Sequence, residues 1–349
     1  MFTRNSHNPL LTPADVVPSR PDFEVIGAFN AGVTVYQDEV LLLVRVAERP
    51  RERVAGVVLC PHLDADGQLI VEQIALDDPD YDTHDPRMMV HRRTGQLLLT
   101  SMSHLRLARS RDGIHFDIAS QPWLTPQPPY ESYGIEDARI TCIEGTYYVN
   151  YSAVGPQGIA TGLVRTQDFD HIERMGIILP PANRDVTILP ARIGGQFICY
   201  HRPMPGTFGG LNIWAAASPD LVHWGDHRLL LAQRHAGWES GRIGGGAPPL
   251  WTEAGWLSIY HAADNDNRYC LGAFVTDLKD PMRLLARSES PILVPEASYE
   301  VEGFFGQVVF TCGAIADGDR LRVYYGAADE SMALAEGSLS AVLASLGIR

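Results

Sequence analysis

A pattern that recurs about every 50 to 65 residues is the feature of this sequence that most limits its fold. In each copy, a turn containing Gly or Asp precedes a strand of aromatic and aliphatic residues that ends in a polar or small residue. The six copies are residues 37–48, 94–103, 144–153, 194–203, 253–262 and 318–327. Three further strands share the ending Ser/Thr-x-Asp-x-x-His, in residues 105–116, 161–172 and 213–224. A repeat of this length, built from short strands, predicts an all-β propeller.

Strand composition and turn residues agree with that prediction. The strands are rich in β-branched and aromatic residues, and most prolines lie outside them. A β-sandwich or two stacked β domains would also give short, regular strands, and these remain the alternatives. No linker or charge run divides the chain, so we expect residues 1–349 to form one domain, with an extension at 1–20 and a tail at 333–349. The tail carries the clearest helical segment, "EGSLSAVLASLGI".

Charge and apolar patterning exclude several classes of partner. The formal net charge of −14 argues against binding to nucleic acid or to an anionic membrane surface. The N-terminal residues show no apolar signal region, and no apolar run reaches 18 residues, so we expect a cytoplasmic protein. Five dispersed cysteines and scattered histidines lack the spacing of metal ligands, so we expect no metal site and no cofactor.

Polar residues at the ends of the repeated strands are the candidate functional residues. In a propeller the innermost strands converge on a central channel, so residues far apart in sequence become neighbours. The residues at such positions are Asn30, Arg45, Asp85, Arg87, Arg106, Glu136, Asp137, Arg184, Asp185, Arg202, Arg242, His261 and Asp329.

Four basic residues in this set recur across consecutive repeats. Arg184 and Arg202 lie in one repeat, Arg242 precedes the Gly-rich run "IGGGAPP", and His261 follows in "SIYHAAD". Arginine suits bidentate binding of phosphate oxygens, and glycines let backbone N–H groups approach an anion. Each arginine could instead form a structural salt bridge, and His261 could be a buried core histidine. Their shared position in the repeats favours one anion site.

The acidic pair Glu136–Asp137 stands at the start of a strand. Successive strand residues point to opposite faces. We therefore expect one carboxylate to enter the central pocket and the other to engage a neighbouring loop or Arg139. Alternation alone does not say which residue has which role.

Several of these motifs, in the same order, resemble those of the β-mannoside phosphorylases of glycoside hydrolase family 130. The motifs are "FEVIGAFNAGV", "LLLVRVAE", "GIEDARI", "NRDVTILP", "YHRP", "SPDLVHWG", "WESGRIGGGAPPL" and "LRVYYGAAD". The resemblance extends over residues 20 to 330. It implies a five-bladed β-propeller with its active site at the central channel, and cleavage of β-mannosides with inversion to release α-mannose 1-phosphate.

The resemblance also implies roles for individual residues. Asp137 corresponds to the general acid, whose proton is thought to pass through a sugar hydroxyl. The resemblance thus assigns the pocket to Asp137 and a structural role to Glu136. Arg184, Arg202, Arg242 and His261 correspond to phosphate-binding positions. Asn30, Arg45 and Asp329 correspond to positions that hold the mannosyl unit, and we expect Arg106 to join them in binding substrate. Arg242 stands where many members have lysine, and Asp185 stands where some have asparagine.

Phosphorolysis and hydrolysis demand different residues. An inverting hydrolase needs a second carboxylate to activate water, whereas a phosphorylase needs a cationic site for its co-substrate phosphate. The basic residues favour phosphorolysis. An inverting β-mannosidase using Glu239, Glu300 or Glu302 is the alternative, and a non-catalytic sugar-binding propeller is a third. Acceptor sugar, linkage and homo-oligomer formation stay open.

Overall fold

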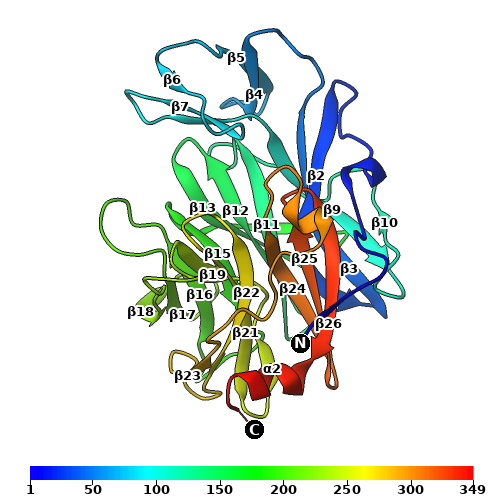
Figure 1. The fold of residues 1–349 in the computed structure, drawn as a ribbon, viewed down its shortest axis with the longest axis vertical. Helices are drawn as coiled ribbons and strands as arrows, with labels where there is room; N and C mark the ends of the chain where they lie inside the picture. The colour runs from blue at the N-terminus through cyan, green and yellow to red at the C-terminus, as the bar shows by residue number, and fades with distance from the viewer. Residues whose placement is uncertain (349) are drawn as a thin grey trace.

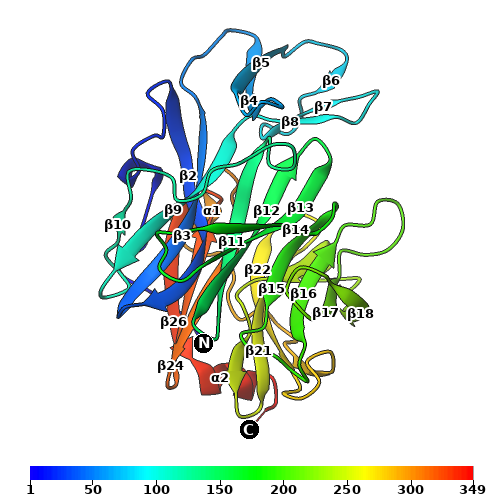
Figure 2. The same ribbon diagram turned by 180° about the vertical axis from the view of Figure 1, so that it is seen from behind.

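A computed structural model describes residues 1–348, and most of its strands pair antiparallel into five consecutive units (Figures 1 and 2). The first unit in the chain contains β2 (Phe23–Tyr36), β3 (Glu39–Pro50), β9 (Met102–Ser110) and β10 (Asp117–Ile118). The second contains β11 (Gly134–Ile143), β12 (Thr146–Gly155), β13 (Gly158–Thr166) and β14 (Glu173–Leu179). The third contains β15 (Asn183–Ile188), β16 (Phe197–Pro203), β17 (Ile213–Ser218) and β18 (Gly225–Leu231).

The last two units complete the set. The fourth contains β19 (Arg242–Gly245), β21 (Gly255–Ala263), β22 (Tyr269–Thr276) and β23 (Leu284–Arg287), with the short β20 (Leu250–Thr252) also paired to β21. The fifth contains β24 (Val309–Asp317), β25 (Arg320–Ala327), β26 (Ser331–Ser338) and, from the other end of the chain, β1 (Thr3–Arg4). Both ends of the described chain therefore contribute to one sheet. Single parallel pairings, β2 with β24 and β9 with β11, join the first, second and last units into one 12-stranded sheet. Part of the segment expected to be a tail is strand β26, and α2 (Leu339–Ser345) confirms the helical prediction.

Five of the six repeats fall on the second strand of a unit. The sixth, 94–103, does not: it spans β8 (Leu97–Leu99) and the first residues of β9. Two small sheets occupy the segment between β3 and β9, formed by β4 (Val57–Leu63) with β5 (Leu69–Ala75), and by β6 (Tyr81–Asp82), β7 (Met88–His91) and β8. This segment lies at one end of the molecule (Figure 1). The prediction of six equivalent repeats is therefore wrong, because 94–103 closes an insertion.

The recurring Ser/Thr-x-Asp-x-x-His ending closes the turn after the third strand in each of the first three units. Asp168, for example, accepts hydrogen bonds from the backbone N–H groups of Asp170 and His171, and its Oδ2 lies 2.8 Å from His171 Nδ1. Asp112 and Asp220 make the same contacts in their own units. These side chains satisfy turn N–H groups that would otherwise lack partners.

Most of the apolar core of residues 1–348 lies between neighbouring units, in five of its seven clusters. One example packs Leu41 and Leu43 of β3 against Ile140 of β11 and Val149 of β12. Another packs Leu257 and Ile259 of β21 against Val309, Leu321 and Val323 of the last unit. The remaining three clusters join the other neighbouring pairs in the same way. Because each such side chain contributes about 1.5–3 kcal/mol when buried, the faces between units hold the sheets together.

The short helical elements lie outside the sheets. They are a 3-10 turn at Pro13–Asp15, α1 (Ser298–Val301) and α2. Within residues 1–348, no helix is long and apolar enough to cross a membrane.

Candidate active site

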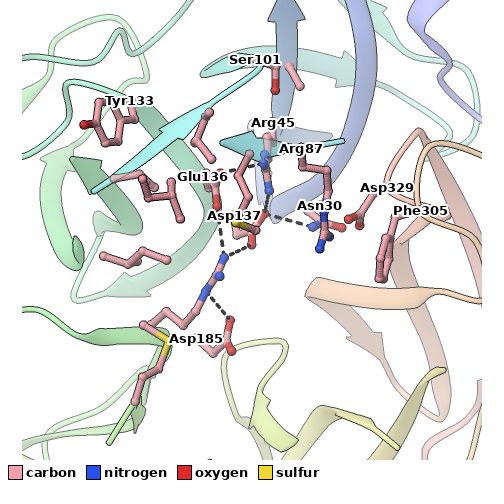
Figure 3. A pocket seen from close by; sticks show the side chains of 18 of the residues that line it. Asn30, Arg45, Arg87, Ser101, Tyr133, Glu136, Asp137, Asp185, Phe305 and Asp329 are labelled. Carbon is pink, nitrogen blue, oxygen red and sulfur yellow. Dashed lines mark hydrogen bonds and ion pairs between the residues drawn. The ribbon is translucent and has the colours of Figure 1, made fainter. Parts of the chain in front are cut away.

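A cavity of about 610 Å³ is lined by residues from all five units and from the insertion between β3 and β9 (Figure 3). First and second strands of the units supply most of its polar side chains. Eight of the nine residues predicted from the sequence to form the site line it: Asn30, Arg45, Asp137, Arg184, Arg202, Arg242, His261 and Asp329.

Three of the lining residues share an unusual backbone conformation at equivalent places. Asn30 of β2, Asp137 of β11 and Asp185 of β15 each lie at a bulge in the first strand of a unit, with φ of 49°, 51° and 56°. This left-handed region is uncommon for residues other than glycine, and Asn and Asp enter it most readily. The bulge re-aims each side chain, so three neighbouring units each deliver a short polar group to the cavity.

The bulge in β11 changes the expected roles of the acidic pair. Glu136 and Asp137 both line the cavity, and both contact the same two arginines (Figure 3). Arg45 lies 2.7 Å from Glu136 Oε1 and 3.1 Å from Asp137 Oδ1. Arg184 Nη2 lies 3.1 Å from Glu136 Oε2 and 3.5 Å from Asp137 Oδ2. The prediction that the two carboxylates point in opposite directions is wrong, because alternation fails where the strand bulges.

Asp137 is 2% exposed and is held on several sides. Asn30 Nδ2 donates to Asp137 Oδ1 at 3.0 Å, and Arg139 donates to the backbone carbonyl of Asp137 at 2.8 Å. Burial alone would raise the pKa of Asp137, but the charges of Arg45 and Arg184 lower that pKa below its usual value. In this arrangement Asp137 is an ionised carboxylate with a fixed orientation.

Asp185 organises the basic residues behind the acidic pair. Its Oδ2 lies 2.8 Å from Arg202 Nη1 and 3.1 Å from His261 Nε2, and its Oδ1 lies 3.3 Å from Arg139 Nη2. Burial would raise the pKa of Asp185, but Arg202 and His261 outweigh it and hold that pKa well below the usual range. Asp185 therefore stays charged and fixes these side chains in place.

Several nitrogens of the basic residues lack hydrogen-bond partners among residues 1–348 although they are buried. They are Arg184 Nε, Arg202 Nε and Nη1, Arg242 Nε and His261 Nδ1. Arg202 Nη1 is close to Asp185 but is poorly aligned for a hydrogen bond. Buried polar groups are nearly always paired in native proteins, so a cluster of unpaired nitrogens indicates a ligand site.

His261 differs from the three arginines in charge. Burial lowers its pKa to about 4, even though Asp185 acts in the opposite direction, so the imidazole is neutral near pH 7. Its ring stacks on Phe310 with centroids 4.1 Å apart. The positive charge of the predicted anion site thus comes from arginine alone.

The glycine run beside Arg242 packs closely against Asp185 and His261. A Cβ on Gly244 would lie 2.5 Å from both Asp185 Oδ2 and His261 Nε2, and one on Gly245 would lie 2.6 Å from the Asp185 carbonyl oxygen. Both residues belong to β19 and pair with β21. These two glycines therefore make room for Asp185 and His261.

Another part of the cavity contains Asp329, Arg87 and Phe305 (Figure 3). Burial raises the pKa of Asp329 to about 6, although Arg45 opposes the change. Arg87, from the insertion, packs over the Phe305 ring at 4.1 Å and forms an ion pair with Asp85 at 2.8 Å. Asp329 and Arg87 are thus placed to bind hydroxyl groups of a small polar ligand.

Arg106 is a correction to the predicted site. It is fully buried, lies outside the cavity lining and contacts Glu48 at 3.4 Å and His104 at 3.0 Å. Arg106 sits in the middle of β9, the third strand of its unit, and is too far out to reach the cavity. The structure therefore places Arg106 in a buried ion pair with Glu48, away from the cavity lining.

Sequence reasoning missed some of the cavity wall. Tyr133, Tyr269 and Phe305 line it, and Arg87 was flagged without a role. Tyr133 lies just before β11, directly ahead of the acidic motif, which was the only sequence signal for it. Glu136 was assigned a structural role, and its contacts with Arg45 and Arg184 place it in the site.

The glutamates proposed to activate water are elsewhere. Glu239 is buried, accepts a hydrogen bond from Tyr260 and pairs with Arg234 and Arg287. Glu300 pairs with Arg4 and accepts from Tyr325 at 2.7 Å, and Glu302 is exposed. None of the three lines the cavity.

Comparisons with known proteins identify relatives of this chain. The sequence profile described as β-1,4-mannooligosaccharide phosphorylase, glycoside hydrolase family 130, matches residues 85–346. A β-1,2-mannobiose phosphorylase of Listeria innocua is 49% identical over 348 residues, covering 99% of this chain and 98% of the relative. A 1,2-β-oligomannan phosphorylase of a Thermoanaerobacter species is 39% identical over 237 residues, 67% of this chain and 78% of its own.

A solved structure is also close. The Listeria innocua β-1,2-mannobiose phosphorylase in complex with β-1,2-mannobiose superposes with a TM-score of 0.97 at 48% identity, over 100% of this chain and 99% of that one.

Proposed function

Because the chain belongs to glycoside hydrolase family 130, we propose that it is a β-mannoside phosphorylase that converts a β-mannoside and inorganic phosphate into α-mannose 1-phosphate and a shortened sugar. The observation that carries the proposal is the group of unpaired nitrogens on Arg184, Arg202, Arg242 and His261 within one cavity. A phosphate ion would supply acceptors to the arginine nitrogens and, if partly protonated, a donor to His261 Nδ1. Three arginines would offset the cost of removing the ion from water.

The neutral His261 suits a partly protonated phosphate. Its Nε2 faces Asp185, so that nitrogen carries the proton and donates it in a hydrogen bond. Nδ1 is then left with a lone pair that can accept a hydrogen bond from a phosphate hydroxyl. The arginines bind the charged oxygens of the same ion.

Chemistry at the anomeric carbon follows from this placement. A phosphate oxygen attacks the anomeric carbon of the mannosyl unit, and the bond from that carbon to the glycosidic oxygen breaks. Attack from the face opposite the leaving group inverts the configuration and gives the α-phosphate. We assign Asp137 as the group that supplies the proton to the departing oxygen, directly or through a sugar hydroxyl.

Phosphate binding also explains how Asp137 can act as an acid. Without an anion, Arg45 and Arg184 keep the Asp137 carboxylate ionised. A bound phosphate would partly neutralise the charge of Arg184. The ionised form of Asp137 would then be less stabilised, and the pKa of Asp137 would rise. The acid would then be protonated mainly when the nucleophile is in place.

Binding of the sugar is assigned to another part of the cavity. We propose that Asn30, Arg45 and Asp329 hold hydroxyl groups of the mannosyl unit, with Arg87 and Phe305 beside them. Asn30 Oδ1 is buried and has no partner within residues 1–348, so it is available as an acceptor.

The hydrolase alternative has less support. An inverting hydrolase needs a carboxylate free to activate water, and the three glutamates considered for that role lie outside the cavity. A purely sugar-binding protein would have no use for unpaired cationic nitrogens beside an acid.

The substrate linkage is proposed from the relatives. The family profile is named for β-1,4-linked oligosaccharides, but the relative that matches along the whole chain is named for β-1,2-mannobiose. We infer that β-1,2-mannobiose is the better disaccharide substrate here.

The arrangement of the five units is interpreted as a five-bladed propeller formed by a single domain. Each unit packs on two neighbours through an apolar cluster, and every unit contributes to the cavity, as blades around a central channel would. Cytoplasmic location and homo-oligomer formation stay predictions.

One assay tests the proposed reaction. Purified protein is incubated with β-1,2-mannobiose, with and without phosphate, and the products are followed by phosphorus and proton NMR. We expect α-mannose 1-phosphate and mannose in equal amounts only when phosphate is present. Release of mannose at the same rate without phosphate would instead show a hydrolase.

A further inference from the structure

A second cavity of about 680 Å³ lies beside the first, on the other side of the turn between β12 and β13. Gln157, in this turn, lines both cavities. The loop before β11 also joins them, because Gln127, Tyr130 and Glu131 line the second cavity while Tyr133 lines the first. The two cavities are therefore neighbours along two separate segments of chain.

The floor of the second cavity is a fixed polar network. Glu131 is buried and accepts hydrogen bonds from Tyr151 Oη at 2.6 Å, from Arg174 Nη1 at 3.0 Å and from the Gln127 backbone N–H at 2.7 Å. Arg174 Nη2 also donates to the carbonyl oxygen of Thr125 at 2.5 Å. Because both carboxylate oxygens are occupied, Glu131 serves to hold the floor rigid and is not free for chemistry.

The rim combines flat apolar surfaces with hydrogen-bonding groups. Tyr130 is 47% exposed, and Pro128 and Pro181 also line the cavity. Gln127 and Gln157 are exposed and present amide groups. Rings that pack on C–H faces, together with a few amides for hydroxyl groups, are the surface chemistry that a carbohydrate requires.

The position of the second cavity fits the leaving side of the reaction. In an in-line displacement, the departing sugar lies on the opposite side from the phosphate. Tyr133 follows Tyr130 and Glu131 of the second cavity in the same loop, and it lies on the other side of Glu136 and Asp137 from Asp185 (Figure 3). Asp185 contacts Arg202 and His261 of the predicted phosphate site. The rest of a longer substrate would leave the first cavity toward Gln157.

We propose that the second cavity binds the outer sugar units of a β-mannan oligosaccharide whose terminal unit occupies the first cavity. This inference rests on the proposed function and extends it: the preferred substrates are oligosaccharides longer than a disaccharide. Tyr130 supplies the stacking surface, and Gln157 guides the chain between the cavities.

Chain-length kinetics test the inference. Phosphate-dependent kcat/KM is measured for β-1,2-linked mannan oligosaccharides from the disaccharide to the hexasaccharide. For the wild type we expect kcat/KM to rise with length. Tyr130→Ala should lower the ratio of long-chain to disaccharide kcat/KM about two- to tenfold, and Tyr130→Phe should restore it because the ring is kept.

A matched control and a binding measurement complete the test. Trp251→Ala removes another exposed aromatic side chain, 60% exposed and outside both cavities, and should leave the ratio unchanged. An equal ratio in wild type and Tyr130→Ala would overturn the inference. If the protein releases no mannose 1-phosphate from any substrate, the proposed function fails. Calorimetric titration with the hexasaccharide then still decides whether Tyr130 forms a sugar site, since its loss must weaken binding.

Discussion

Glu136 and Asp137, consecutive residues of one strand, direct their carboxylates to the same pair of arginines. Arg45 and Arg184 each contact both acids, with the closest nitrogen–oxygen distances between 2.7 and 3.5 Å. Two positive and two negative charges therefore balance before any ligand binds. In the proposed reaction an incoming phosphate would disturb this balance through Arg184, so we expect phosphate binding and protonation of Asp137 to be coupled.

Asp137→Asn should abolish most of the turnover. Loss of a general acid typically costs about 10²–10⁴-fold in rate, and asparagine keeps the shape and tolerates the left-handed backbone. The measurement is kcat for mannose 1-phosphate release, with circular dichroism to verify the fold. Asp117→Asn, an exposed residue of β10, is the control. Turnover near the wild-type value in a folded Asp137→Asn protein would remove Asp137 from the mechanism.

Arg242→Gln should raise the KM for phosphate about 10- to 100-fold, because a charge-assisted hydrogen bond is worth about 1.5–3 kcal/mol. The KM for mannobiose should change little, since Arg242 packs over Tyr269 and beside Asn267, and neither is assigned to the sugar. Initial rates with varied phosphate measure this. Arg228→Gln, an exposed pair with Asp226, is the matched control. An unchanged phosphate KM would place the anion elsewhere.

Arg106→Gln tests whether Arg106 stabilises the fold or binds substrate. Breaking a buried ion pair leaves Glu48 uncompensated and should lower the free energy of unfolding by about 3–5 kcal/mol. KM for mannobiose should stay the same, because Arg106 does not line the cavity. Urea denaturation and kinetics measure the two effects. Arg109→Gln in the same strand, a partly exposed pair with Glu39, should cost less than about 1 kcal/mol. A raised KM with unchanged stability would restore Arg106 to the substrate site.

Asp329→Asn should make stability less sensitive to pH. The folded-state pKa of Asp329, about 6, is higher than the ordinary value of an aspartate, so the folded protein holds this proton more tightly than the unfolded chain does. The wild type therefore loses stability as pH rises from about 4 through 6. We expect Asp329→Asn to have the higher Tm at pH 7.5 and little advantage at pH 4, measured by scanning calorimetry. A lower Tm at pH 7.5 would show that the pairing of Asp329 with Arg45 outweighs its burial.

The sequence predicted the repeating units better than it predicted individual side-chain directions. Second strands could be located because each repeats one apolar pattern. Arg202 and His261 could be grouped because each lies near the end of such a strand. Residues 94–103, at the end of the insertion between β3 and β9, carry the same apolar pattern. Only the strand pairing shows that they do not form the second strand of a unit.

Errors at single residues have local causes. Strand alternation predicts opposite side-chain directions for Glu136 and Asp137. The extra residue of the bulge between Glu136 and Arg139 breaks this alternation, and nothing in "GIEDARI" marks the bulge. Arg106 was predicted to lie at the end of a strand, whereas it lies in the middle of β9, the third strand of its unit. The basicity of His261 depends on burial, which is a property of the whole fold.

The left-handed backbone at Asn30, Asp137 and Asp185 also limits which amino acids these positions can exchange. Asn, Asp and Gly adopt this left-handed conformation more readily than glutamate and glutamine do. The exchange of Asp137 for Glu would thus strain the strand as well as lengthen the acid. Met88 and Tyr133 also line the cavity, but neither has a positive φ. Substitutions aimed at new acceptor sugars therefore meet fewer backbone constraints at these two residues than at Asn30, Asp137 and Asp185.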